Sequence, residues 1–236
     1  VYEQAKKLRG ILTDLESNLY SSKPKGRVSI TMPHHIAHLF MPEVLQAFRG
    51  LYPEIELDLI LDDHRLNLIS DEVDLAIRVG VPKDESIIAR IMHEEKVSLF
   101  ASPEYLEKFG EITSLESLTK CRWVLLGKPS NNPTQHLFNT HGEVSIEPRY
   151  YSFCNSPFMI RNMLLKGLGV GKLLPSIASQ EIKSGRLVSV MPSLTGQTVS
   201  FSLIYPSRMQ IPLRIRTTID YLLDKNIFHS GLQQDN

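Results

Sequence analysis

After residue 26 the chain alternates between strand patterns and helical patterns, and this alternation restricts the fold more than any other feature. Residues 28–31 alternate as in a strand. The apolar residues that follow recur at helical spacing and are Ile36, Leu39, Phe40, Val44 and Phe48. Strand patterns return at 55–61 and 73–79, with a short helix expected at 66–70. Strands that alternate with helices favour a mostly parallel sheet covered on both faces, which predicts an α/β fold.

A β-rich stretch at 87–101 closes this part, and a second set of alternating patterns follows it. Ser102 is expected to cap a helix whose first turn contains Pro103. Further strands are expected at 123–126, 145–153, 170–173, 187–191 and 199–205, helices at 157–166, 175–183 and 215–222, and a polar loop at 127–135. At ~100–200 residues per domain, the chain of 236 residues can hold one large or two modest domains.

The first twenty residues carry a heptad pattern. Apolar residues recur at alternating spacings of four and three, and they are Val1, Ala5, Leu8, Leu12, Leu15 and Leu19. A stripe of this kind along a helix requires a partner helix. We therefore predict an amphipathic linker helix at 1–23, with Leu8, Leu12, Leu15 and Leu19 forming the contact between two copies. Because Val1 is neither an initiator methionine nor a capping residue, we expect the helix to continue upstream.

The composition excludes several classes of protein. The 26 basic and 26 acidic residues balance, so this chain has no overall field to hold a nucleic-acid backbone. No apolar run approaches the ~18 residues that a membrane span needs, and the first stretch is too charged for a secretory signal. Cys121 and Cys154 have no metal-binding spacing and can form at most one disulfide. We expect a cytoplasmic protein without a membrane partner.

Several short motifs then occur in a fixed order along the chain. They are GRVSI at 26–30, Pro42, Phe48, Tyr52-Pro53, DLAIRVG at 74–80, ASPEYL at 101–106, GLGVG at 167–171, Leu174-Pro175 and YPSR at 205–208. Each motif alone is weak, but the ordered set is specific and covers nearly the whole chain. In this order the motifs resemble the effector-binding portion of LysR-type transcriptional regulators.

The resemblance implies an α/β fold with two Rossmann-like subdomains of the type 2 periplasmic-binding-protein fold. The subdomains would comprise 26–101 with 200–236, and 102–199, joined by two crossovers near Ala101 and Val199. It also implies a small-molecule effector in the cleft between the subdomains and a homodimer or homotetramer. DNA would be bound through an upstream winged helix-turn-helix that this sequence lacks. The resemblance implies no cofactor and no enzymatic activity.

Two helix starts are candidate parts of an effector site. In open α/β sheets, ligands gather beyond the carboxyl ends of strands, where helix amino termini present free N–H groups that favour an anion. One start contains His34, His35 and Ile36, and the other contains Asn155, Ser156 and Phe158 around Pro157. By the resemblance, His35 occupies the effector-contact position at which many relatives carry Ser or Thr. An imidazole at this position would allow a pH-sensitive contact.

Four more residues complete the predicted effector site. Lys128 follows the strand at 123–126, where it is a plausible contact at the rim. Ser102, Gly169 and Val170 border the expected cleft by their place in the motifs. Gly167 is interpreted as a helix-ending residue with positive φ, and Gly169 as a point at which the backbone approaches another group closely.

Other functions find less support in the sequence. His34, His35 and His38 share a helix, but no Cys, Asp or Glu within that segment completes a metal site. The glycines at 167–171 follow a helix, whereas a dinucleotide-binding loop precedes one. Neither cysteine has a context that suggests activation, and we expect buried, inert thiols.

Two alternatives remain open at this point. An exported type 2 solute-binding protein would share the fold, and so would an enzyme such as a transferase. The solute-binding protein would not need the leading heptads, and the enzyme would need convergent acid and base groups that the sequence does not present. Arg78 lies within an apolar strand and is interpreted as an ion-pair partner, with Asp74 as one candidate partner, more readily than as an effector contact.

Overall fold

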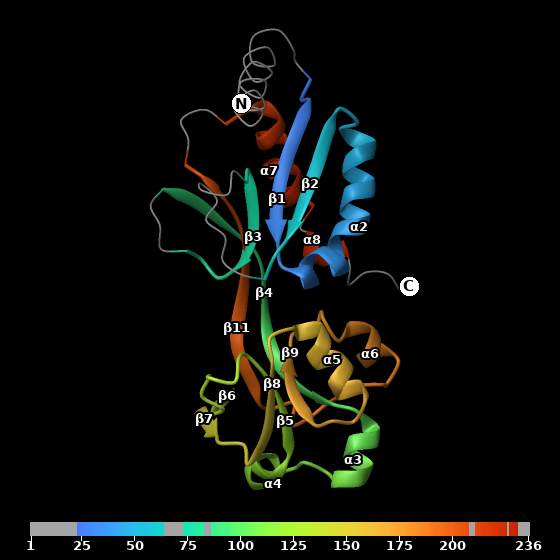
Figure 1. The fold of residues 1–236 in the computed structure, drawn as a ribbon, viewed down its shortest axis with the longest axis vertical. Helices are drawn as coiled ribbons and strands as arrows, with labels where there is room; N and C mark the ends of the chain where they lie inside the picture. The colour runs from blue at the N-terminus through green and yellow to red at the C-terminus, as the bar shows by residue number, and fades with distance from the viewer. Residues whose placement is uncertain (1–22, 64–72, 83–85, 208–210, 226, 231–236) are drawn as a thin grey trace. The chain divides into compact units, whose positions relative to one another are not determined.

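The computed structural model describes residues 23–63, 73–82, 86–207, 211–225 and 227–230. The heptad segment and the helix expected at 66–70 lie outside this range. The chain divides into two compact units, which we call unit 1 (up to His93 and again from Ser200) and unit 2 (Glu94–Val199). Strands β4 (Ile87–Ala101) and β11 (Thr195–Pro206) each run from one unit into the other (Figure 1). The subdomain limits expected from the sequence remain a prediction.

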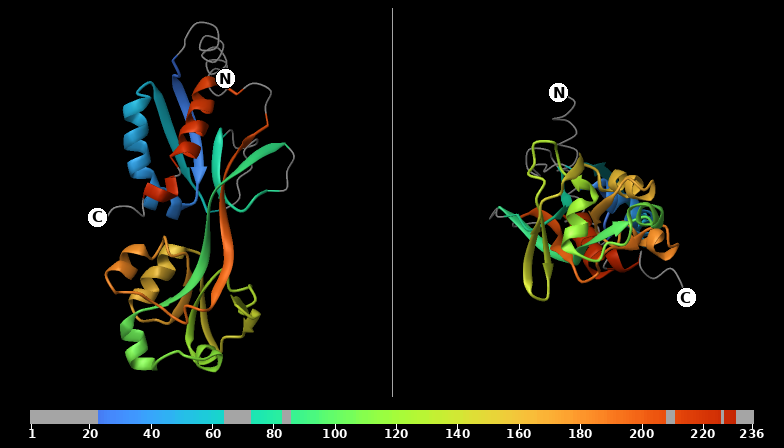
Figure 2. Two further views of the ribbon diagram at one scale, coloured as in Figure 1. Left: turned by 180° about the vertical axis from the view of Figure 1, so that it is seen from behind. Right: turned by 90° about the horizontal axis from the view of Figure 1, so that it is seen from below.

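Unit 1 is a sheet with helices on it. The strand order is β2 (Ile55–Leu61), β1 (Gly26–Met32), β3 (Leu75–Val79) and β11. Strand β1 is parallel to β2 and β3, whereas β11 is antiparallel to β3. Helix α2 (His34–Leu51) packs on β2 and on α8 (Ile227–Ser230), and α7 (Leu213–Asp224) packs on β1 (Figure 2).

The core of unit 1 follows from two periodicities in the sequence. Strand β1 fully buries Val28, Ile30 and Met32 at every second position, and Thr31 near its end is also buried. Helix α2 buries Ile36, Phe40, Val44 and Phe48, which recur every fourth residue and therefore share one face. The expected strand at 28–31 and the expected helix are thus confirmed.

The strands of unit 2 continue this order with β4, β9 (Val170–Leu173), β5 (Arg122–Leu126) and β8 (Tyr150–Cys154). Strand β5 is parallel to β8 and β9, and β4 is antiparallel to β9. The other elements are β6 (Gln135–Asn139), β7 (Gly142–Ile146), β10 (Val188–Ser189), α3 (Pro103–Phe109), α4 (Leu115–Lys120), α5 (Pro157–Leu165) and α6 (Ser179–Lys183).

A single tryptophan marks the core of unit 2. Trp123 is 1% exposed and packs in a cluster that includes Leu118 and Leu137. Its indole Nε1 donates a hydrogen bond to the carbonyl of Leu118 at 2.9 Å. The ring therefore fixes β5 against α4 without leaving a buried donor unpaired.

The expected cap at Ser102 is confirmed. Its Oγ accepts the N–H of Tyr105 at 3.3 Å, and Pro103 occupies the first turn of α3. Proline fits there because its missing N–H would have no helical partner.

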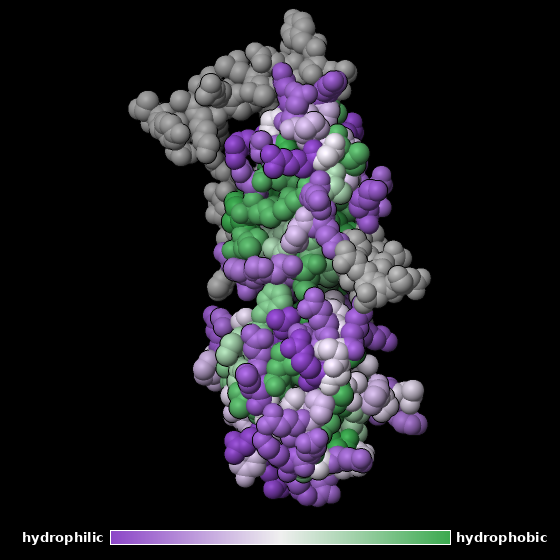
Figure 3. Space-filling view, turned by 90° about the vertical axis from the view of Figure 1, so that its right-hand side faces the viewer, coloured by the Kyte–Doolittle hydropathy of each residue, from purple (hydrophilic) through white to green (hydrophobic). Residues whose placement is uncertain are grey.

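Figure 3 shows a face on which apolar side chains gather on unit 1 and are flanked by polar ones.

Several sequence expectations for unit 2 were wrong. The strand expected at 145–153 is two strands, β7 and β8, because the chain breaks around Pro148, which has no N–H for a ladder. Strand β7 pairs antiparallel with β6, whereas β8 pairs in parallel with β5, so the two strands join different neighbours in the sheet. The polar loop ends where β6 begins at Gln135, and the helix expected at 175–183 starts only at Ser179. Helices α4 and α8 were not predicted.

Candidate functional site

The start of α2 lies at the edge of unit 1 where the parallel strands β1, β2 and β3 all end. Pro33 is the N-cap residue and offers no side-chain acceptor. Asp63, which follows β2, supplies one instead: its Oδ1 accepts the N–H of His34 at 3.1 Å. Its Oδ2 lies 3.5 Å from Nδ1 of the same histidine. A carboxylate of the chain itself therefore occupies the positive end of this helix.

His35, the next residue, is buried. Its ring is 8% exposed and stands edge-on to Phe201, with 6.0 Å between the ring centroids. The Nε2 atom has no hydrogen-bond partner among the described residues. Burial lowers the pKa of His35 to about 4, His34 also lowers it, and Asp63 opposes the shift. The imidazole is therefore neutral at pH 7, and its role as an effector contact stays a prediction, as does that of Ile36, which is 1% exposed.

Arg78 lies near the end of β3, at the same edge. Its Nη2 donates to Oγ1 of Thr31 at 2.6 Å and its Nη1 donates to the carbonyl of Ile77 at 3.2 Å. Burial lowers its pKa, while Asp62 and Asp63 raise it. The suggested ion pair with Asp74 was wrong, because the guanidinium of Arg78 bonds Thr31 and Ile77 instead.

Asp74 has other partners instead. Its Oδ2 accepts hydrogen bonds from the N–H of Ser29 at 2.9 Å and from its hydroxyl at 3.0 Å. Sequence reasoning missed the role of Asp63 at the helix start. The available signal was its place, two residues after the end of a parallel strand.

In unit 2, the corresponding edge gathers Lys128, Asn155, Ser156 and Phe158, because β5 and β8 are parallel and end side by side at Leu126 and Cys154. Helix α5 starts there. Ser156 is its N-cap, and its Oγ accepts the N–H of Met159 at 3.4 Å. Lys128 and Asn155 are exposed, and Ser156 and Phe158 are half-buried. These four predicted residues therefore lie at one edge.

Sequence reasoning missed Arg161 at this helix start. Its guanidinium carbon lies 5.0 Å from the centroid of the Phe158 ring, which places a cation over the first turn of α5. The signal was the spacing of three residues, which puts both side chains on one face of the helix.

The remaining predicted residues of unit 2, Ser102, Gly169 and Val170, lie at the opposite edge of its sheet. Phe100 pairs with Gly171, so β4 ends where β9 begins. A Cβ at Gly169 would lie 2.2 Å from the carbonyl oxygen of Arg122, so the predicted close approach is confirmed and is made to the backbone. Effector contact by these three residues stays a prediction.

Gly167 and the two cysteines were also the subject of expectations from the sequence. Gly167 has a φ of +68°, as expected of a residue that ends a helix. Cys121 is buried, and burial raises its pKa to about 11, which keeps the thiol protonated and unreactive. Cys154, also expected to be buried, is only half-buried, and its thiol lies 3.6 Å from the carbonyl of Ser156.

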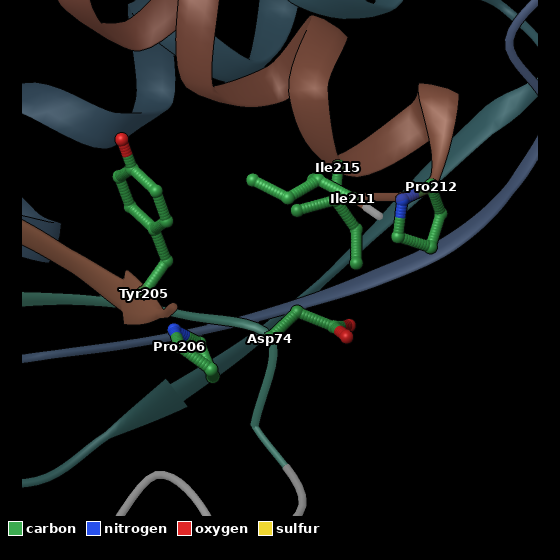
Figure 4. Close-up of a pocket in the computed structure, with 6 residues that line it drawn as sticks. All are labelled: Asp74, Tyr205, Pro206, Ile211, Pro212 and Ile215. Atoms are coloured by element: carbon green, nitrogen blue, oxygen red, sulfur yellow. The ribbon is translucent and has the colours of Figure 1, made fainter. Parts of the chain in front are cut away.

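A small pocket in unit 1 lies at the amino edge of its sheet, and Figure 4 shows the residues that line it. It encloses about 260 Å³, part of which is open solvent, and is lined by Asp74, Tyr205, Pro206, Ile211, Pro212 and Ile215. Asp74 lies just before β3 begins, and Tyr205 lies near the end of β11, which runs antiparallel to β3. The pocket is therefore at the amino ends of the parallel strands. The pocket contains none of the predicted site residues.

Two features are absent from the residues that the structure describes. No group of three or more His, Cys, Asp or Glu side chains there is arranged to hold a metal ion. Within the same part of the chain, no helix has the length and apolar character required to cross a membrane.

Comparison with known proteins identifies the family of this chain. Residues 21–226 match the family described as the LysR substrate binding domain. The HTH-type transcriptional regulator CrgA of Neisseria meningitidis serogroup C is 30% identical over 86% of this chain and 68% of that protein. The HTH-type transcriptional regulator PtxR of Pseudomonas aeruginosa is 26% identical over 91% of this chain and 68% of that protein.

A solved structure gives the same result. The regulatory domain of CrgA from Neisseria meningitidis, a LysR-type transcriptional regulator, superposes with a TM-score of 0.74 at 26% identity, covering 86% of this chain and 99% of that chain. This likeness confirms the mixed α/β fold of the periplasmic-binding-protein type that the sequence predicted. The chain belongs to the LysR substrate binding domain family.

Proposed function

We propose that this effector-binding domain of a LysR-type transcriptional regulator senses a small anionic metabolite through the starts of α2 and α5. The observation that carries the proposal is the start of α5. There a nine-residue helix begins at the carboxyl edge of parallel strands, capped by Ser156, with Lys128 after the neighbouring strand. The free N–H groups at the start of α5 and the positive charge of Lys128 both favour a carboxylate at the carboxyl ends of these strands.

The proposed mechanism is a population shift. An effector changes the regulator only if it binds one arrangement of the protein more tightly than another, because a ligand indifferent to the two states shifts nothing. We propose that the segment at 1–23 transmits this arrangement to a DNA-binding domain outside this chain. We propose no catalytic role and a cytoplasmic location.

We further propose that the chain assembles as a homodimer or homotetramer. Strands β2 and β8 lie at the two ends of the strand order, and each carries exposed apolar side chains. Ile60 on β2 is 40% exposed, and Tyr150 and Tyr151 on β8 are 57% and 48% exposed. Exposed apolar groups on edge strands support association between copies.

A ligand screen tests the sensing proposal. Small carboxylic acids and their neutral amides are tested by thermal shift and then by calorimetry, because a ligand that prefers the folded state raises its melting temperature. We expect acids to bind and amides to bind more weakly. Ser156→Ala and His35→Ala should each change the affinity. Unchanged affinity for a demonstrated ligand in both variants would remove these residues from the site.

Sedimentation tests the assembly proposal. The double substitution Leu12→Lys with Leu15→Lys should weaken the oligomer because it places charge in the heptad stripe. Effector affinity should change little. An oligomer of unchanged stability would show that this stripe does not join two copies.

A further inference from the structure

The small pocket at the amino edge of unit 1 contains a carboxylate that is only partly used. Oδ2 of Asp74 accepts hydrogen bonds from the N–H of Ser29 at 2.9 Å and from its hydroxyl at 3.0 Å. Among the residues that the structure describes, Oδ1 of Asp74 has no hydrogen-bond partner and the carboxylate has no ion-pair partner. Asp74 is half-buried and lines the pocket. Its second oxygen is therefore available to a ligand.

The other side chains that line the pocket offer Asp74 no donor. Two are prolines, which have no N–H, and two are isoleucines, which are apolar. The fifth is Tyr205, and Figure 4 shows that its hydroxyl points away from Asp74. A carboxylate partly withdrawn from water among apolar groups is unfavourable unless a cation or a donor compensates it. Among its lining residues, the pocket therefore lacks a positive partner for Asp74.

The size and chemistry of the pocket indicate which cation fits. The pocket encloses about 260 Å³, part of which is open solvent, so a narrow group enters it more readily than a ring. Because Ser29 already uses Oδ2, one oxygen of Asp74 remains. A single oxygen suits the point contact of an ammonium better than the two parallel bonds of a guanidinium. Pro206 and Ile211, both half-buried, give a short alkyl chain an apolar surface to cover.

The start of α7 also borders the pocket, since Pro212 is its N-cap residue. The positive end of this helix opposes a bound cation. Its effect is weaker than that of a hydrogen bond between two charged groups. Direct contact with Asp74 is therefore what decides whether a cation binds.

We propose that this pocket binds a primary ammonium group at the end of a short alkyl chain, which a free amine or a lysine side chain can supply. The ammonium donates a hydrogen bond to Oδ1 of Asp74, and the alkyl chain lies against Ile211 and Pro206. The pocket shares no residue with the proposed effector site at the starts of α2 and α5. The inference does not rest on the sensing function, and it adds a cationic ligand to a domain for which we propose an anionic one.

The direct test is an NMR titration of the full chain labelled at its isoleucine methyl groups. The δ1-methyl signal of Ile211 is assigned by its loss in Ile211→Val. The probes are n-butylamine, n-butanol, butylguanidine and tetramethylammonium at constant ionic strength and about pH 7, where an alkylamine is protonated. We expect n-butylamine to shift this signal in a saturable way and to bind at least about tenfold more tightly than the other three. A signal that responds no more to n-butylamine than to n-butanol overturns the inference.

The amide of Nα-acetyl-lysine distinguishes the two sources of the ammonium. An affinity close to that of n-butylamine supports a lysine side chain as the ligand. An affinity at least about tenfold weaker supports a free amine, because only the unbranched chain then enters the pocket.

A charge-removing variant tests the role of Asp74. Asp74→Asn keeps an acceptor for Ser29 and removes the charge, so it should lower the affinity for n-butylamine about tenfold. The matched control is Asp220→Asn, which removes an exposed carboxylate from α7 outside the pocket and should leave the affinity within about twofold. Unchanged affinity in Asp74→Asn contradicts the proposal. If that variant does not fold, the comparison of n-butylamine with n-butanol in the unaltered chain decides the matter.

Discussion

The starts of α2 and α5 both lie at the carboxyl ends of parallel strands in their units, but their first N–H groups are capped in different ways. Helix α2 has a proline at its N-cap and takes its acceptor from Asp63, which lies 29 residues further along the chain. Helix α5 is capped by Ser156, the residue directly before it, with Pro157 in its first turn. The α2 start therefore depends on tertiary structure, whereas the α5 start is encoded locally.

The electrostatics of the two starts differ in the same way. At α2, a carboxylate already lies at the positive end of the helix, and a neutral imidazole is buried beneath it. At α5, the cation Arg161 stands over the first turn with its anionic partner, Glu181, 3.9 Å away. We therefore expect an anionic effector to bind first at α5, and to bind at α2 only when it displaces Asp63.

The largest expected effect concerns pH and His35. Its pKa is about 4 in the folded chain, against about 6.5 when unfolded. Between these values the unfolded chain binds a proton that the folded chain does not. The contribution of neutral His35 to the free energy of unfolding is therefore complete above about pH 6.5. It is lost as the pH falls toward about 4, and the loss is up to about 3 kcal/mol.

Urea unfolding at about pH 7 and about pH 4 measures this loss. His35→Leu should reduce the decrease in unfolding free energy, because an apolar replacement cannot bind the proton. The matched control is His141→Gln, which removes an exposed histidine and should leave the decrease unchanged. If His35→Leu loses as much stability on acidification as the unaltered chain, the α2 start does not contain a buried neutral imidazole.

The next effect concerns Asp63. Asp63→Ala removes the acceptor of the His34 N–H and should lower the free energy of unfolding by about 1 kcal/mol. Asp63→Asn keeps an acceptor and should cost less. Asp63→Ala should also raise the affinity of the α2 start for an anionic ligand, which calorimetry measures. Equal stability of the alanine variant and the unaltered chain would show that α2 needs no tertiary cap.

The smallest effect concerns Ser156. Its hydrogen bond to the N–H of Met159 is long, at 3.4 Å, so Ser156→Ala should cost only about 0.5 kcal/mol, at the low end for a cap. Ser156→Asp should restore this stability, because a carboxylate caps well and suits the helix dipole. Chemical unfolding of the two variants gives the comparison. A loss in Ser156→Ala larger than that in Asp63→Ala would reverse the proposed ranking of the two starts.

These differences explain what the sequence could predict. The cap at Ser102 was readable, and the cap of α5 was narrowed to Asn155 or Ser156, because the capping residue, the proline and the helix are contiguous. The cap from Asp63 and the burial of His35 against Phe201 were not, because each joins residues brought together only by the sheet. Pro148 was a readable signal that the expected strand at 145–153 is broken, since proline cannot donate to a ladder.

The most direct test of the account is a backbone amide NMR map of the carboxylic acid that most raises the melting temperature. We predict the largest shifts at 155–159, at the start of α5, with smaller shifts at 34–36, at the start of α2. Shifts concentrated around Tyr205 and Ile215, in the small pocket of unit 1, would contradict the account.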